Sequence, residues 1–209
     1  MKHAHIVPLV GGAAIGASLA LKSNPEYIAS WEVFAKNDSF CREYFKNTPF
    51  HTIAANGKTV IREDKYIKGL DKLPRVDLIT CVPPCSGLST ATPNTSRGCA
   101  APQNEHMLKV AEFGMQTKTL VILIENAPTL YSKGGEEFAI KFLPLCKKYG
   151  YTMMLLKTST ILHGLPQNRV RSFCILYKGI KLPEFQWIKK PYKPLHEWRV
   201  EKSSEPAKD

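Results

Sequence analysis

The segment LVILIENAP, residues 120–128, decides the fold, because five apolar residues run directly into an acidic residue, an amide and a proline. Its leucines and β-branched side chains predict a buried strand over Leu120–Glu125. Similar apolar runs predict further strands over Ala4–Val10, Tyr27–Phe34, Val76–Cys81, Tyr151–Thr158 and Ser172–Tyr177. Helical patterns between these runs predict helices near Ala13–Lys22, Asp38–Lys46, Glu105–Gln116 and Glu136–Tyr149. Strands that alternate with helices are typical of an α/β fold with a mostly parallel sheet.

The length of 209 residues fits one ordinary domain. We expect this domain to span residues 1–180, and a basic arm rich in proline and aromatic residues to span 181–209. The uncharged, mostly apolar stretch Ile6–Leu21 falls short of the ~20 apolar residues of a membrane span and lacks the pattern of a secretory signal. We therefore expect a cytoplasmic protein with no targeting signal and no membrane partner.

The charge balance favours a polyanionic partner. Lysine and arginine number 29 against 18 acidic residues, which gives a net charge of +11. A basic surface attracts nucleic acid, although charge alone is equally compatible with a generic basic protein. The six cysteines are too few and too scattered for a disulfide scaffold. No second pair of cysteines or histidines follows Cys81 and Cys85 at zinc-site spacing, so we expect no metal.

Four chemically distinctive segments lie at the edge where an open parallel sheet binds its ligands: three follow predicted strands, and the fourth comes just before the last one. The first is the glycine-rich run Val10–Gly16, which opens a predicted helix. Glycines there allow a ligand to approach the backbone, and the helix start offers free N–H groups. Glu32 lies about 20 residues further on, where a carboxylate can bind ribose hydroxyls. A surface glutamate is the alternative interpretation.

The second segment places a cysteine, Cys85, directly after two prolines that stiffen the end of a strand. An 18-residue loop, 86–103, follows it and carries one charged residue, Arg97. Loops of that length without secondary structure are usually functional or disordered. A thiol held at such a place acts as a nucleophile if its pKa is lowered; otherwise it is an inert buried cysteine.

The third and fourth segments supply charged groups to the same edge of the sheet. Glu125 ends the strand of the opening segment, so its carboxyl is half-buried and can hold a proton near neutrality; a helix cap is the alternative. In Gln167-Asn168-Arg169-Val170-Arg171 the alternating arginines place both guanidiniums on one side of an extended chain. Paired guanidiniums suit a carboxylate, a carbonyl or a phosphate, although surface arginines are common.

Taken together and in this order, the segments resemble the motifs of the cytosine-5 DNA methyltransferase family, over about His5 to Tyr177. Pro83-Pro84-Cys85 is similar to its Pro-Cys nucleophile motif, Glu125-Asn126-Ala127 to its Glu-Asn-Val motif, and Gln167 to Arg171 to its Gln-x-Arg-x-Arg motif. The resemblance implies a Rossmann-like sheet with helices on both faces, which binds S-adenosylmethionine. It also implies transfer of a methyl group to carbon 5 of cytosine in duplex DNA through a covalent cysteine adduct on a flipped base.

The resemblance also implies a role for individual residues. By this resemblance Cys85, Glu125, Arg169 and Arg171 are catalytic residues. It also implies that the cofactor is bound by Leu9, Gly11, Gly12, Glu32, Asp64 and Pro84, and that DNA is bound by Ser89, Arg97 and Gln167.

The chain also departs from the family pattern. It has Val7-Pro8-Leu9-Val10-Gly11-Gly12-Ala13-Ala14 where the family has Asp-x-Phe-x-Gly-x-Gly-Gly. It ends about 38 residues after Arg171, where the family continues into a target recognition domain and two further motifs. We therefore expect either a second polypeptide that supplies this part or a truncated remnant, in a bacterial or phage-infected cell. The alternatives are a tRNA cytosine-5 methyltransferase, to which the Pro-Pro-Cys form of the motif points, and a non-catalytic DNA-binding or regulatory protein.

Overall fold

The structure is a computed structural model of the 209-residue chain. It describes residues 1–35, 39–54, 59–62, 65–68, 73–89, 104–131, 133–179 and 190–197. Of the predicted site residues, Asp64 and Arg97 lie outside these ranges. None of the described helices is both long and apolar enough to cross a membrane.

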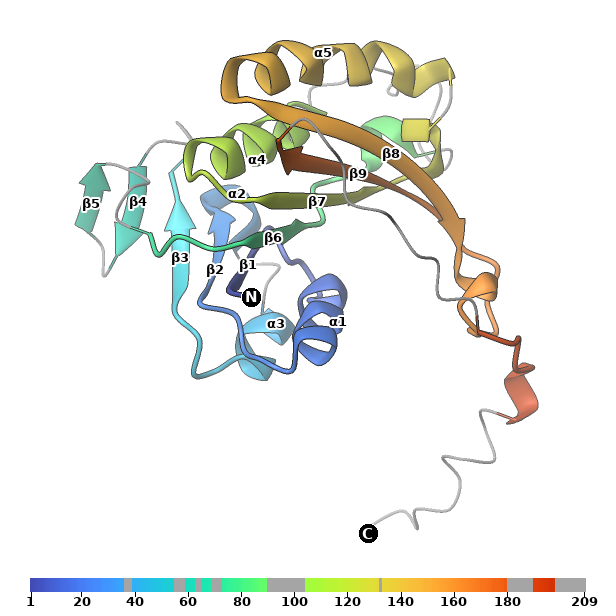
Figure 1. Ribbon diagram of the computed structural model, residues 1–209. Helices are drawn as coiled ribbons and strands as arrows, with labels where there is room; N and C mark the ends of the chain where they lie inside the picture. The colour runs from blue at the N-terminus through green and yellow to red at the C-terminus, as the bar shows by residue number, and fades with distance from the viewer. Residues whose placement is uncertain are drawn as a thin grey trace, which may run out of the picture.

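One sheet organises the described chain (Figure 1), with the strand order β5-β4-β3-β2-β1-β6-β7-β9-β8. The strands are β1 (His3–Ile6), β2 (Tyr27–Trp31), β3 (Phe50–Ile53), β4 (Thr59–Arg62), β5 (Lys65–Lys68), β6 (Leu78–Cys81), β7 (Val121–Asn126), β8 (Tyr151–Ser159) and β9 (Val170–Lys178). The centre, from β3 through β7, is parallel. The order reverses at β1, so the carboxyl ends of β1 and β6 border the crevice where such sheets bind ligands.

The expectation of a mostly parallel sheet is wrong at both edges. β9 enters antiparallel between β7 and β8, and β4 and β5 add an antiparallel extension beside β3. The sheet is therefore mixed, while its central strands keep the expected parallel arrangement. The antiparallel insertion of β9 matters for the site, because it brings the start of β9 to the carboxyl end of β7.

Helices cover both faces of this sheet, as predicted (Figure 1). The helices α4 (Glu105–Gln116) and α5 (Lys133–Tyr149) lie on one face, and α1 (Gly12–Leu21) and α3 (Ser39–Tyr44) lie on the other. A short α2 (Glu32–Ala35) follows β2, and the 3-10 turns η2 (Ser86–Leu88), η5 (Pro128–Tyr131) and η6 (Thr160–Leu162) lie in connections.

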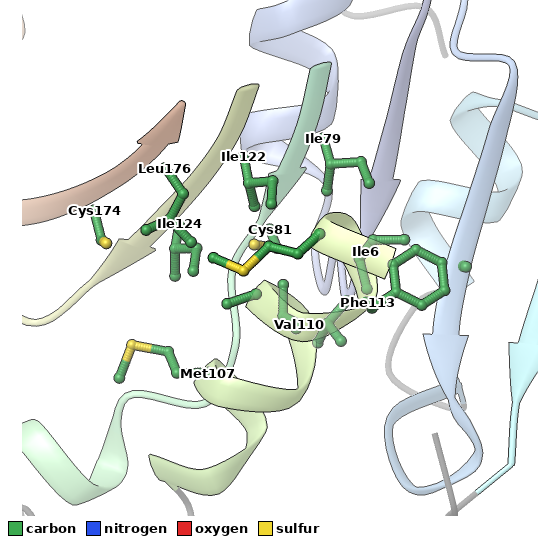
Figure 2. Packing of buried hydrophobic residues seen from close by; sticks show 14 of the residues in the cluster. Ile6, Ile79, Cys81, Met107, Val110, Phe113, Ile122, Ile124, Cys174 and Leu176 are labelled. Atoms are coloured by element: carbon green, nitrogen blue, oxygen red, sulfur yellow. The ribbon is translucent and has the colours of Figure 1, made fainter. Parts of the chain in front are cut away.

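The main core lies between α4 and the sheet. One side of α4 is fully buried, which explains why its periodicity predicted both of its ends correctly. Figure 2 shows Met107, Val110 and Phe113 of α4 against strand residues that include Ile122 and Ile124. The helix approaches β7 so closely that a Cβ added to Gly114 would lie 2.6 Å from Ile122 Cδ1.

Two predicted strands end earlier than expected. β1 stops at Ile6, because Val7 and Leu9 adopt positive φ angles of 52° and 51° that turn the chain out of the sheet. β2 stops at Trp31, and Glu32 begins α2. The short strands β3, β4 and β5 were not predicted from the sequence.

Candidate active site

A cavity of about 440 Å³ opens at the carboxyl ends of β1, β6 and β7, beside the start of β9. This volume lies within the range of small-molecule sites. Its lining residues come from five places in the chain that the fold brings together: Pro8 to Ala13, Thr80 to Pro83, Cys85, Leu123 with Glu125, and Arg169, Arg171 and Phe173. The four residues predicted to be catalytic are therefore neighbours, although up to 86 positions separate them in sequence.

The glycine-rich turn forms one wall of the cavity. Gly11 is the N-cap residue directly before α1; it has a φ of 90°, and its N–H donates to the Pro8 carbonyl at 2.9 Å. A Cβ at Gly11 would lie 3.2 Å from Cys41 Sγ, so both the turn and the packing favour glycine. Around Gly12, by contrast, a Cβ would meet nothing within 4 Å. The backbone at this helix start is therefore open to the cavity, and Leu9, Gly11 and Gly12, which the sequence predicts for a cofactor site, line it.

The turn after β6 holds Cys85 at the cavity. Pro83 and Pro84 have no backbone N–H, so Val82 is the last residue before Cys85 whose backbone can donate a hydrogen bond. The Val82 N–H donates to the Val7 carbonyl at 3.4 Å. The Leu88 N–H donates to the Cys85 carbonyl at 2.9 Å, which closes the turn into η2. Cys85 itself is exposed, whereas the other described cysteines are buried. An accessible thiol in a cavity can reach a ligand, and buried thiols cannot.

Glu125 and Arg171 form an ion pair at the β7–β9 side of the cavity, separated from the glycine turn after β1 by the strand β6. Arg171 Nε donates to Glu125 Oε1 at 2.8 Å, and each side chain is roughly three-quarters buried, with 25% and 21% exposed. Phe173 lies directly opposite Glu125 across the β7–β9 ladder, and Arg171 is two residues away on the same face. Burial raises the pKa of Glu125, and the nearby Arg171 and Arg169 oppose that rise. The carboxyl is thus able to hold a proton closer to neutrality than an ordinary glutamate.

Arg169 completes the charged wall from the turn between β8 and β9. Its backbone is fixed twice to Thr160, through Thr160 N–H to the Arg169 carbonyl and Arg169 N–H to Thr160 Oγ1, both at 3.0 Å. The side chain is exposed at the cavity. The site therefore carries two guanidiniums, of which Arg171 is paired with Glu125 and Arg169 faces solvent.

Several predicted site residues lie outside this cavity. Among the described residues, Glu32, Pro84, Ser89 and Gln167 do not line it. Glu32 is exposed at the first position of α2, beyond the end of β2. The Gln167 side chain is exposed, and the backbone carbonyl of Gln167 accepts a hydrogen bond from the Thr160 hydroxyl. These four residues can therefore contact the predicted cofactor or DNA only if that ligand extends beyond the cavity.

Nine lining residues were not among the predicted site residues. Six of them lie in or beside the predicted motifs: Pro8, Val10, Ala13, Cys81, Val82 and Pro83. The other three are Thr80, Leu123 and Phe173. Each of these three residues lies on a strand that adjoins or contains one of the predicted motifs. Alternation along β7 could have identified Leu123, because it lies on the same face as Glu125. Phe173 could not have been found this way, since its position depends on the antiparallel entry of β9 beside β7.

Comparisons with known proteins agree with this architecture. A profile of the family described as C-5 cytosine-specific DNA methylase matches residues 10–206. A prophage-encoded E. coli protein described as a DNA modification methyltransferase superposes with a TM-score of 0.64 at 16% identity, over 93% of this chain and 52% of that one. The Entamoeba histolytica methyltransferase EhMeth gives 0.56 at 15% identity, over 92% and 57%. The S. pombe methyltransferase Dnmt2 gives 0.56 at 15%, over 88% and 51%.

At these identities the solved structures establish the fold alone, which is the Rossmann-like fold that these methyltransferases share. This chain spans about half the length of those structures. No curated protein matches its sequence significantly.

Proposed function

Because this chain belongs to the C-5 cytosine-specific DNA methylase family, we propose that it transfers a methyl group from S-adenosylmethionine to carbon 5 of cytosine in duplex DNA. The observation that carries the proposal is the single cavity in which Cys85, Glu125 and Arg171 lie across from an open glycine turn. A thiol, a carboxyl and a guanidinium around one cavity are the groups that this reaction requires.

The glycine turn is the place for the cofactor. S-adenosylmethionine supplies an electrophilic methyl group when bound. The backbone from Leu9 to Gly12 lines the cavity, and the exposed Gly12 leaves room for close approach. Glu32 would reach the ribose hydroxyls of a cofactor that extends past the cavity towards α2. We assign Pro84 and Asp64 to the same cofactor site on the basis of the family motifs.

Cys85 is the nucleophile in this proposal. Carbon 5 of cytosine reacts poorly by itself, so the thiolate first adds to carbon 6, which forms an S–C6 bond and makes carbon 5 electron-rich. Glu125 stabilises the negative charge that develops towards ring nitrogen 3 by sharing its proton there. Carbon 5 would then take the methyl group as the bond between that group and the cofactor sulfur breaks, which leaves the sulfur as a neutral thioether. Loss of the carbon 5 proton to solvent then restores the ring double bond as the S–C6 bond breaks and releases the Cys85 thiolate.

The arginines support this step electrostatically. Arg171 holds the Glu125 carboxyl in place through the 2.8 Å bond and presents its remaining N–H groups to the base carbonyl. The exposed Arg169 adds positive charge at the cavity mouth. A cytosine inside a duplex cannot reach these groups, so the base must flip out of the stack at a cost of a few kcal/mol.

DNA is the proposed substrate, and its phosphates would meet the basic surface. The net charge of +11 favours that contact, and we assign Ser89, Arg97 and Gln167 to it. We further propose that a second polypeptide carrying a target recognition domain supplies sequence readout, that residues 1–180 form the catalytic domain, and that 181–209 form an arm.

The decisive experiment measures methyl transfer and adduct formation by the full chain. Labelled S-adenosylmethionine is incubated with duplex DNA or with tRNA, and 5-fluorocytosine DNA is used to trap the cysteine adduct. We expect label in DNA and a trapped adduct on Cys85. Cys85→Ser should abolish both, whereas the buried Cys146→Ser on α5 serves as the matched control and retains them.

The other outcomes separate the alternatives. Label in tRNA and not in DNA would assign the chain to tRNA modification. Turnover that persists in Cys85→Ser would refute the covalent mechanism. A chain that binds DNA and neither methylates nor traps, with and without neighbouring gene products, would be a non-catalytic DNA-binding protein.

A further inference from the structure

The 3-10 turn η5 connects the three segments that carry the catalytic groups. It follows β7 directly, and the Leu130 N–H donates to the Ala127 carbonyl at 3.1 Å. On one side, Ser172 Oγ donates to the Pro128 carbonyl at 3.1 Å. Ser172 is fully buried and is the immediate neighbour of Arg171 on β9. The turn η5 is therefore fixed to the strand that supplies the arginine.

On its other side, η5 reaches the turn that carries Cys85. The Thr129 hydroxyl donates to the Leu88 carbonyl, across 41 positions of sequence. Leu88 is only 3% exposed, and its own N–H donates to the Cys85 carbonyl at 2.9 Å. A continuous series of hydrogen bonds thus runs from β9, through η5 and Leu88, to the backbone of Cys85.

The Cys85 turn depends on this attachment. The two prolines before the cysteine have no N–H groups, so they give the turn no donor towards the sheet. The Val82 bond to Val7 at 3.4 Å is near the limit of a hydrogen bond. A buried carbonyl such as that of Leu88 also needs a donor, because water cannot reach it.

We propose that Thr129 is a positioning residue, whose hydroxyl holds the Leu88 carbonyl and so keeps Cys85 facing Glu125 and Arg171. The inference rests on the proposed function, because it assigns Thr129 a role in placing the nucleophile. A shift of about 1 Å in a reacting group can cost on the order of 100-fold in rate, so a single such bond is sufficient to matter.

The test compares Thr129→Val, Thr129→Ser and a matched control in the full chain. Valine has nearly the shape of threonine and lacks the hydroxyl, whereas serine keeps it. Thr152→Val is the control, because Thr152 Oγ1 also donates to a backbone carbonyl, that of Gly179, at the opposite end of the β8–β9 pair. Two readouts are used: hydrogen exchange of the Leu88 amide, and the rate at which Cys85 forms an adduct with 5-fluorocytosine DNA.

In Thr129→Val we expect the Leu88 amide to exchange at least tenfold faster and the adduct to form at least tenfold more slowly. We expect KM for DNA to stay within about twofold, and Thr129→Ser to restore both rates to within about threefold. Thr152→Val should change neither. Unchanged exchange in Thr129→Val, or faster exchange with an unchanged adduct rate, would overturn the proposal. A wild-type chain that never forms the adduct would instead refute the proposed function, whatever the exchange shows.

Discussion

The ion pair between Arg171 and Glu125 allows a quantitative prediction for the double-mutant cycle of Arg171→Gln and Glu125→Gln. Two unit charges about 4 Å apart interact by roughly 4 kcal/mol at an effective dielectric constant of ~20. About a quarter of each side chain is exposed, so solvent screens part of this attraction. A hydrogen bond to a charged group contributes ~1.5–3 kcal/mol. We therefore expect a coupling free energy of about 2 kcal/mol at pH 8.

The coupling should depend on pH in a defined direction. It exists only while Glu125 is ionised, and burial raises the pKa of Glu125 above its ordinary value of 4.5. The coupling is therefore larger at pH 8 than at pH 5, because the carboxyl gains its proton as the pH falls. In Arg171→Gln the opposing charge is gone, so the pKa of Glu125 rises further. Urea denaturation of the four proteins at pH 8 and pH 5 measures both free energies.

Arg169 provides the internal control for this cycle. It faces the same cavity, but its side chain is exposed, so its coupling to Glu125 should stay below about 0.5 kcal/mol. A coupling near zero between Arg171 and Glu125 at pH 8 would refute the reasoning, as would a coupling that is the same at both pH values.

Four further predictions concern other parts of the molecule. Glu32→Ala should weaken S-adenosylmethionine binding by ~1–3 kcal/mol in calorimetry, and an unchanged affinity would refute that cofactor contact. Gly114→Ala should lower the free energy of unfolding by ~1–3 kcal/mol, since its Cβ would clash with Ile122, whereas Gly16→Ala on the open side of α1 should raise it by ~0.5–1 kcal/mol. His5 is buried, with burial and then His3 lowering its pKa to about 3, so it stays neutral in the folded chain while it protonates near 6.5 when unfolded. Stability should therefore fall by up to ~1.4 kcal/mol per pH unit below pH 6.5, and His5→Asn should flatten this slope in urea denaturation. The chain alone should bind DNA with a steep salt dependence and little discrimination between sequences, which titrations of different duplexes at several salt concentrations would check.

The elements that the sequence predicted best are those whose pattern is local. The ends of α4 follow from its apolar periodicity, and β7 from its unbroken apolar run. The run from Ala4 to Val10 is equally apolar, yet β1 ends at Ile6, because the turn that follows depends on backbone angles that hydrophobicity does not encode. The strands β3, β4 and β5 are only four residues long, and they form by pairing outward from β2. Such pairing is a tertiary effect, so local reasoning missed it.

The site was predictable to the extent that chemistry followed strand ends. Cys85 follows β6 and Glu125 ends the apolar run of β7, whereas the two arginines lie at the start of β9; the fold places all four around one cavity. Thr129 could not be found this way, because its proposed role rests on a hydrogen bond to a residue 41 positions earlier. No spacing rule in the sequence links an ordinary threonine to the turn that carries Cys85.

The structure also explains the altered glycine motif. Of the three glycines in the family pattern, only the first occupies a turn that needs one here, and Gly11 is kept with a φ of 90°. Ala13 and Ala14 replace the other two inside α1, where alanine is the better helix former, and Ala14 is fully buried. The strain lies instead at Val7, a β-branched residue at a φ of 52°, a conformation that costs ~1–3 kcal/mol. Its N–H still donates to the Ala29 carbonyl at 2.8 Å, so β2 holds the strained turn in place, and the wall of the cavity survives the loss of two motif glycines.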